Sequence, residues 1–298
     1  MSTLHSLVLN YENPDLTSAA VASLQGTRNP PDSVLVVDNG SSETAFERLR
    51  ALLPAAVQVL RLHENQGIPG ALNAGVDRLL RAGPDAILIV MNDVRLDGVD
   101  CGALRDALAG EGVGAVAPVQ CRADAPTVVH TAGGLLNDRW WTTSHRSNGA
   151  STDSLPDRLP DADFLDFSCV AVNAAAWRAV GELRADFKFY WDDVEWSLRA
   201  RDAGFRLAMS TERCQHSVGG TMGTGVNPVA LARSAHNRWA TQRLCADRLS
   251  LTARVLAPVR EAVRLVVHPR TRRGSRYELR GWWRVYVRRM GPGNFRGI

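Results

Sequence analysis

The sequence has almost no lysine and no paired cysteines, and each absence narrows the class of protein. Lys188 is the only lysine among 35 basic residues. A bound phosphate group would therefore have to be neutralised by arginine, backbone N–H groups or a metal ion. The five cysteines are odd in number and form no Cys-x-x-Cys pair. This argues against a disulfide framework or zinc knuckle and favours reduced thiols in a cytoplasmic setting.

Long apolar runs and glycine-rich nucleotide motifs are missing as well. The most apolar run, Ala86–Met91, is far shorter than the roughly 20 residues of a membrane span. Met1–His5 has no basic region ahead of a long apolar stretch, so we expect no signal peptide. Neither Gly-x-Gly-x-x-Gly nor Gly-x-x-x-x-Gly-Lys-Ser/Thr follows the first apolar run. This argues against a dinucleotide-binding Rossmann domain and against a P-loop.

Positive charge is concentrated at the C-terminal end of the chain. Residues 230–298 contain 16 arginines and three acids, although the net charge of the whole chain is only +4. The tail His268–Arg289 interleaves arginines with tryptophan and tyrosine. This composition predicts a peripheral membrane contact or a homo-oligomeric interface with the acidic body of another subunit. We expect no nucleic-acid partner, although a basic, aromatic tail can also suit one.

Apolar runs alternate with helical patterns over the first ninety or so residues. The expected strands are His5–Asn10, Ser33–Val37, Val57–Leu62 and Ala86–Met91, and the expected helices are Asp15–Gln25, Glu43–Leu53 and Ala71–Ala82. This alternation predicts an α/β fold with a doubly wound, mostly parallel sheet and helices on both faces. Polar clusters follow all four strands, at Asn10–Glu12, Asp38–Ser41, Asn65–Gly67 and Asn92–Asp93. In such a sheet these clusters face one crevice.

The pattern is less regular after residue 95. Residues 137–160 read as a long polar loop containing Trp140 and Trp141, and loops of this length are usually functional or disordered. The Trp140–Trp141 pair is a candidate platform for the apolar face of a sugar, with coverage of the core as the alternative. Ser217–Pro228 has four glycines and is expected to form a mobile flap. Val229–Leu249 and Leu251–Val267 are expected to form two helices.

The stretch Phe187–Arg199 places three carboxylates, Asp192, Asp193 and Glu195, inside a cluster of aromatic residues. Aromatic neighbours raise the cost of an uncompensated charge. A general base, a metal ligand and a hydroxyl clamp would each explain the acids. The structural alternative is a helix N-terminus capped by acids, with Asp192 and Glu195 spaced as in a capping box.

Several of these motifs occur in an order that is typical of one family. They are Asn10–Asn13, Val36–Ser41, Asn65–Gly67 with Asn73–Gly75, Asn92–Asp93, Phe189–Glu195 running to Arg199 and Gly204, and His216 before Gly219–Thr221. Each motif is weak alone, but together, over residues 4–245, they resemble an inverting glycosyltransferase of family 2 with the GT-A fold. The Asp-Asp-x-Glu pattern and the later His236–Arg238 are most similar to the branch of rhamnosyl- and galactofuranosyltransferases.

The resemblance implies a nucleoside-diphosphate sugar donor, with UDP or dTDP, and a Mg²⁺ or Mn²⁺ ion. Tyr11 and Asp38 match the nucleobase contacts. The Tyr11 ring would stack on the base, and the Asp38 carboxylate would accept a hydrogen bond from N3–H of a pyrimidine. Asp93 and His216 match the residues that hold the metal against the diphosphate. The other positions that match the nucleotide site are Asn10, Asn65, Gly67 and Asn92.

On the acceptor side, the resemblance implies that Asp193 is the general base and Asp192 its neighbouring acid. Glu195 is a competing base, and we expect it to contact the acceptor together with Trp191 and Trp140. The acceptor would be a carbohydrate, a lipid-linked sugar or a small molecule. We expect a glycosyltransferase domain at 1–228, with a donor half 1–95 and an acceptor half 96–228. A basic helical extension would follow at 229–298, in a protein of the cytoplasm or the inner membrane face.

One departure from the family pattern affects the metal. The family's Asp-x-Asp is here Met91-Asn92-Asp93, so methionine replaces the first acid. A metal-independent enzyme and a non-catalytic nucleotide-sugar-binding protein of the same fold are therefore alternatives. A nucleotidyltransferase is the rival enzyme class. It would need basic residues in the first loop, and Asn10–Asp15 has none.

Overall fold

The computed structural model describes residues 2–217, 228–245, 247, 249, 251–267 and 272–289. The predicted flap lies mostly outside these residues, as do the Gly219–Thr221 motif and His268–Thr271 at the start of the basic tail. All five cysteines are free thiols, and four of them are buried. Among the described helices, none combines the length and the apolar character that a bilayer crossing requires.

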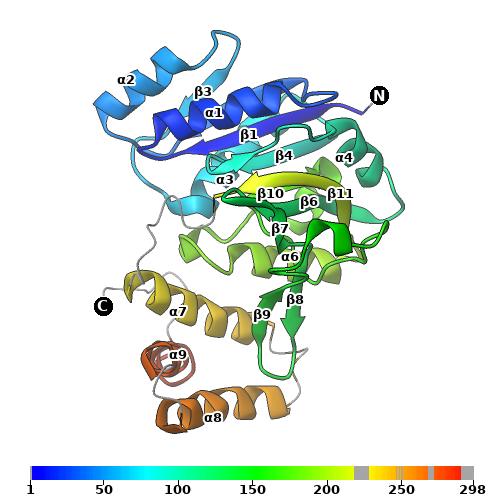
Figure 1. The fold of residues 1–298 in the computed structure, drawn as a ribbon. Helices are drawn as coiled ribbons and strands as arrows, with labels where there is room; N and C mark the ends of the chain where they lie inside the picture. The colour runs from blue at the N-terminus through cyan, green and yellow to red at the C-terminus, as the bar shows by residue number, and fades with distance from the viewer. Residues whose placement is uncertain are drawn as a thin grey trace.

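The first half of the chain forms the predicted parallel sheet, with strands in the order β3-β2-β1-β4 (Figure 1). The helices between them match the helical patterns, except that α3 begins four residues before the predicted start. Its first turn contains Gly67 and Pro69, and proline is tolerated there because its missing N–H has no helical partner. The bounds are β1 Leu4–Asn10, α1 Pro14–Gln25, β2 Ser33–Asp38, α2 Glu43–Leu52, β3 Gln58–Arg61, α3 Gly67–Leu80 and β4 Ala86–Met91.

The second half extends the sheet with strands of mixed direction. Strand β10 is antiparallel to both of its neighbours, β4 and β6, and β11 then runs parallel to β6. The predicted polar loop after residue 137 instead contributes β9 to a hairpin with β8. The bounds are β5 Val94–Arg95, α4 Cys101–Leu108, β6 Val113–Arg122, β7 Ala125–Thr131, β8 Gly134–Asn137, β9 Thr142–His145, η1 Thr152–Ser154, β10 Cys169–Asn173, α5 Ala174–Val180, η2 Ala185–Phe187, α6 Asp192–Asp202 and β11 Arg206–His216.

Alternate residues of the central strands enter two different cores. Leu4 and Val8 of β1 face one core with α1, α2 and α4, whereas Leu7 and Leu9 face the other with α3, α5 and α6. Because successive side chains on a strand point to opposite faces, a continuous apolar run is needed when helices cover both. The second core requires very close packing at Gly75, where an added Cβ would lie 2.1 Å from Cδ1 of Leu7.

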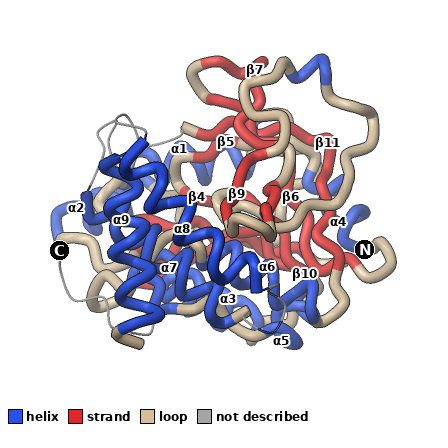
Figure 2. Tube along the Cα trace, turned by 90° about the horizontal axis from the view of Figure 1, so that it is seen from below, coloured by secondary structure: helices blue, strands red, loops and turns tan. Residues whose placement is uncertain are grey.

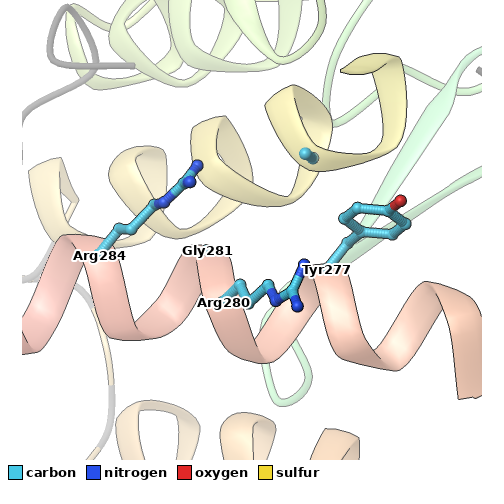
Figure 3. Close-up of a pocket in the computed structure, with 5 residues that line it drawn as sticks. Tyr277, Arg280, Gly281 and Arg284 are labelled. Atoms are coloured by element: carbon cyan, nitrogen blue, oxygen red, sulfur yellow. The ribbon is translucent and has the colours of Figure 1, made fainter. Parts of the chain in front are cut away.

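The C-terminal helices pack beyond α6, on the side away from the sheet (Figures 1 and 2). They are α7 Pro228–Leu244, α8 Leu251–Val267 and α9 Arg272–Trp282, followed by a π-helical turn η5 at Trp283–Val287. Trp239 of α7, Ala257 of α8 and Val285 of η5 share one hydrophobic cluster with Trp191 and Val194. These helices therefore complete a core under the N-terminus of α6. A small pocket between α7 and α9 is lined by Ala232, Tyr277, Arg280, Gly281 and Arg284 (Figure 3).

Candidate functional site

The ends of β1, β2 and β4 are joined by a buried polar network. Asp38, fully buried, accepts hydrogen bonds from Nδ2 of Asn10 at 2.7 Å and from Oγ of Ser41 at 2.6 Å. Thr17 Oγ1 donates to Oδ1 of Asn10 and accepts from Nδ2 of Asn92. Three of the predicted nucleotide-site residues, Asn10, Asp38 and Asn92, are thus brought together. The hydrogen bonds offset the desolvation of the Asp38 carboxylate.

The remaining predicted nucleotide residues lie around this network. The side chain of Tyr11 is 40% exposed, so its ring is available to a ligand. Asn65 is exposed, and its Oδ1 accepts from the backbone N of Gly67 at 2.8 Å. Gly67 has φ +79°, and a Cβ at this position would lie 2.6 Å from the carbonyl oxygen of Lys188. The Asn65–Gly67 turn therefore packs directly against the loop that leads to the acid pair.

That loop, Phe187–Trp191, has an unusual backbone. Lys188, Tyr190 and Trp191 all have positive φ angles, between 62° and 68°, a region that non-glycine residues rarely adopt. Nδ2 of Asn237, on α7, donates to the carbonyl oxygens of Phe187, Phe189 and Tyr190, each at 3.0 Å. One amide of the C-terminal extension therefore holds the strained loop in place. In the sequence, only the His236–Arg238 motif pointed to Asn237, and that motif did not indicate which segment Asn237 contacts.

The loop delivers Asp192 and Asp193 to the first turn of α6. Asp192 is 5% exposed, and desolvation raises the pKa of its carboxyl to about 7, with the charges of Asp166 and Glu195 adding to the shift. Asp193 keeps some solvent contact, but burial by surrounding protein atoms and then the charge of Asp192 raise its pKa well above the usual range. The two carboxyls together form a coupled pair that holds protons at a higher pH than isolated acids do.

The three predicted acceptor-side residues have different surroundings. Glu195 is buried and receives three hydrogen bonds from Arg199, at 2.9 to 3.1 Å, so in this structure its carboxylate is engaged in an internal ion pair. Trp191 is 8% exposed and belongs to the cluster beneath α6. Trp140 is half-buried beside the guanidinium groups of Arg139 and Arg260. Trp141, not Trp140, fills the core.

Asp93 and His216, the predicted metal residues, lie side by side. Nε2 of His216 is 3.6 Å from Oδ1 of Asp93, and its Nδ1 is 2.9 Å from Oε1 of Gln120. Burial opposes protonation of His216, but the hydrogen bond to Asp93 and the charges of Asp166 and Asp93 raise its pKa above 6.5. With a proton on Nδ1 donated to Gln120, a neutral His216 would keep its Nε2 lone pair for a metal ion, whereas without a metal a proton on Nε2 faces Asp93.

Two further residues, which the sequence analysis did not identify, complete a metal-type cluster. Ligand atoms of His130, Asp166 and His216 all lie within 4.8 Å of one another. Burial, with His145 and His216 nearby, lowers the pKa of His130 to about 4, so its imidazole is neutral at pH 7 and can donate a lone pair. Imidazole nitrogen and carboxylate oxygen are both ligands of divalent metal ions in proteins, so this donor set could hold one.

Ser168 connects this cluster to the end of β4. Its backbone N donates to Oδ1 of Asp166, its hydroxyl donates to Gln120, and its carbonyl accepts from the backbone N of Met91 at 2.8 Å. Ser168 thus contacts Met91, the position where methionine replaces an acid, and Asp166 precedes Ser168 by two residues in the chain. Because the charge of Asp166 shifts the pKa of Asp192, Asp193 and His216 alike, the acid pair and the histidines belong to one electrostatic site.

Solved structures of similar fold are glycosyltransferases. GalNAc-T7 with UDP, GalNAc and Mn²⁺ matches at 12% identity and a TM-score of 0.62, over 82% of this chain and 48% of its own. The mannosyltransferase PcManGT from Pyrobaculum calidifontis, in complex with GDP-Man and Mn²⁺, matches at 16% and 0.55, over 96% and 87%. TarS from S. aureus matches at 15% and 0.53, over 91% and 44%.

These likenesses establish the fold of the chain. The mixed α/β sheet flanked by helices is the GT-A fold of glycosyltransferases, as the sequence motifs predicted. The chain spans about half the length of GalNAc-T7 and less than half that of TarS. No protein-family model and no curated protein matches the sequence.

The hydrogen bonds from Asn237 to the loop Phe187–Trp191 can be tested by proteolysis after Lys188, the single lysine of the chain. Asn237→Asp replaces the donating amide with a carboxylate, which faces three carbonyl oxygens. We expect this change to destabilise the loop by at least about 2 kcal/mol. A lysine-specific endoprotease can cut the untagged chain only after Lys188, which lies in this loop. The protease can cut only when the loop opens, so cleavage should become at least tenfold faster in the variant.

The matched control is Asn148→Asp, at an exposed amide that donates to only one carbonyl, that of His130. We expect cleavage after Lys188 to be unchanged in this control. Equal cleavage rates for Asn237→Asp and the unmodified chain would show that the loop does not depend on the amide.

The buried Asp192 predicts a pH-dependent stability difference. The folded pKa of about 7 lies above the ordinary value of 3.8, so the folded state binds more protons between these values and loses stability as the pH rises through them. Asp192→Asn removes this penalty. The variant should be more stable than the unmodified protein at pH 8 by about 2–4 kcal/mol, and nearly equal at pH 4. Denaturant unfolding at both pH values measures the difference, with the exposed Asp138→Asn as control. A gain that is the same at both pH values would contradict the desolvation account.

Proposed function

We propose that this protein transfers a sugar from a nucleoside-diphosphate sugar, with UDP or dTDP, to an acceptor hydroxyl with inversion at the anomeric carbon. The observation that carries the proposal is the pair Asp192–Asp193 in one electrostatic site with the His130–Asp166–His216 cluster. A displacement of this kind needs a carboxylate to take the acceptor proton and positive charge at the departing diphosphate. The site offers residues for both tasks, and the GT-A fold of the chain supports the proposal.

In the proposed reaction, the acceptor oxygen attacks the anomeric carbon while the bond to the diphosphate oxygen breaks. The proton of the acceptor hydroxyl passes to a carboxylate oxygen of Asp193, and the electron pair of the broken bond stays on the diphosphate. A raised pKa brings Asp193 closer to the pH at which a general base is most effective. Asp192 contributes by raising that pKa through its charge. Glu195 is held by Arg199, which favours Asp193 as the base.

The donor would occupy the strand ends. Tyr11 supplies an exposed ring for the nucleobase after β1, and Asn65 lies at an exposed turn after β3, two strands along the same edge of the sheet. His216 would hold the metal together with His130 and Asp166, and Asp93 lies next to His216. When bound, a divalent ion supplies positive charge for the diphosphate. The Asp166 carboxylate would stand in for the acid that is missing at Met91.

We further propose that the acceptor is a carbohydrate, a lipid-linked sugar or a small molecule that enters beside Trp191 and Trp140. The order of the motifs favours the rhamnosyl- and galactofuranosyltransferase branch. A metal-independent enzyme and a non-catalytic sugar-nucleotide-binding protein are the alternatives. They differ from the main proposal in the two experiments that follow.

The first experiment tests the base. A thermal-shift screen of UDP-, dTDP- and GDP-sugars with Mn²⁺ identifies the donor that the chain binds. Release of nucleoside diphosphate from that donor then measures turnover. Asp193→Asn should bind the donor normally and lose at least about a hundredfold in turnover. Asp202→Asn, at the exposed end of the same helix, should retain activity. Near-normal turnover of Asp193→Asn would refute the base assignment, and donor binding without turnover in the unmodified chain would favour a binding protein.

The second experiment tests the metal residues by calorimetric titration with Mn²⁺. The unmodified chain should bind, and His216→Gln and Asp166→Asn should each weaken binding at least about tenfold, as expected for loss of one ligand. The control is Asp163→Asn, because this nearby acid pairs with Arg201 instead. Identical isotherms for all four proteins would remove the cluster as the metal site. No Mn²⁺ binding by the unmodified chain, with or without donor, would favour the metal-independent alternative.

A further inference from the structure

Helix α8 exposes a continuous apolar stripe on its outer side. The side chains of five valines are half or more exposed, namely Val255 at 52%, Val259 at 50%, Val263 at 53%, Val266 at 72% and Val267 at 59%. At about 100° per residue, these positions fall within an arc of about 120° on the helix. Isolated exposed valines need no explanation, but a contiguous apolar surface of this kind usually marks an interaction site.

The opposite side of α8 is fixed to the rest of the protein. Ala257 is fully buried, and Glu261, the only acid of the helix, is 2% exposed. The Glu261 carboxylate accepts from Oγ of Ser275 and pairs with Arg238 at 3.7 Å. The inner side therefore uses the only negative charge of α8, and no residue on the outer side of this helix is acidic. Figure 1 shows α8 at the end of the molecule opposite to α1 and α2.

The surroundings of the stripe are basic. Arg260 and Arg264 lie half-buried beside the stripe, with Arg264 3.5 Å from the Glu261 carboxylate, and residues 230–298 contain 16 arginines against three acids. On the neighbouring α9, Arg280 is exposed and lines the pocket toward α7 (Figure 3). An apolar stripe flanked by arginine and free of acid is complementary to a surface that is apolar inside and anionic outside.

We propose that α8 docks this protein onto an anionic lipid bilayer, lying flat with its valines at the boundary between headgroups and acyl chains. The arginines contact lipid phosphates, while the buried side keeps α8 attached to α7 and α9. A second copy of the chain fits the stripe less well, because a symmetric α8–α8 contact would bring two arginine-rich helices together. The proposal is independent of the chemistry of the candidate site.

The described part of the later tail exposes fewer large apolar side chains than α8 does. The sequence favoured His268–Arg289, where aromatic residues alternate with arginines. In the structure, Val285 is buried, Gly281 packs against the backbone of Ala235, and the hydroxyl of Tyr286 donates to Gln242. Part of the apolar side of that segment is therefore used inside the protein, and Trp283 and Val287 are its large apolar side chains that stay exposed, at 52% and 46%. The valines of α8 provide the apolar surface, and α9 adds positive charge.

Vesicle co-sedimentation with the full chain tests the proposal. Vesicles of phosphatidylcholine with phosphatidylglycerol should bind the protein, pure phosphatidylcholine vesicles should bind it much more weakly, and added salt should reduce binding. The triple variant Val255→Gln/Val259→Gln/Val263→Gln should bind at least tenfold more weakly, because glutamine keeps helix propensity but removes the apolar stripe. Leu52→Gln, at an exposed position on α2, is the matched control and should bind normally.

Thermal unfolding checks that the triple variant folds. If the triple variant does not fold, the single variant Val263→Gln is used instead, and we expect it to lose less binding. Absence of binding by the unmodified chain, equal binding to both vesicle types, or full binding by the valine variants would overturn the proposal. Sedimentation velocity without lipid tests the rival occupant. A dimer that the triple variant converts to monomer would assign the stripe to a second copy of the chain.

Discussion

The site depends on keeping two neighbouring carboxyls, Asp192 and Asp193, in a place where water is scarce. Burying an ionised carboxylate is costly unless it is compensated, and these two also repel each other when both are ionised. The first turn of α6 offers backbone N–H groups and the positive end of the helix dipole, which reduce the cost without removing it. The raised pKa of each carboxyl reflects the cost of burying its charge that these groups do not remove. That remainder gives the pair a proton affinity suited to acid–base chemistry.

The backbone that holds this pair is strained, and the strain is supported from outside the sheet. Positive φ at Lys188, Tyr190 and Trp191 costs on the order of 1–3 kcal/mol for each residue. The three hydrogen bonds from Asn237 and the shared cluster of Trp191 with Trp239 offset that cost. The C-terminal helices are therefore part of the site even though they contribute no acid to it. A change in how α7 to α9 pack would alter the acid pair before it altered the donor side.

The sequence was most informative where the signal is local. Each of the first four strands could be located because apolar runs and polar turns are read within a few residues, and parallel pairing then gathers Asn10, Asp38 and Asn92 without further information. The sequence was silent where partners are distant. His130 comes from the edge strand β7 and Asp166 from the segment before β10, so no spacing rule relates them to His216. Likewise, no pattern shows that Trp141 is buried while Trp140 stays half-exposed.

Met91 stands where the family pattern has an acid, and two hydrogen bonds link this position to Asp166 through Ser168. A ligand on β4 would have come from the same turn as Asp93, with its position set by the strand. Here the backbone N of Met91 instead bonds to the carbonyl of Ser168, and the backbone N of Ser168 bonds to Asp166. The Asp166 carboxylate therefore reaches the region of His216 from the segment just before β10, the antiparallel neighbour of β4. In the proposed function, this exchange keeps a metal site near the diphosphate although the sequence motif is incomplete.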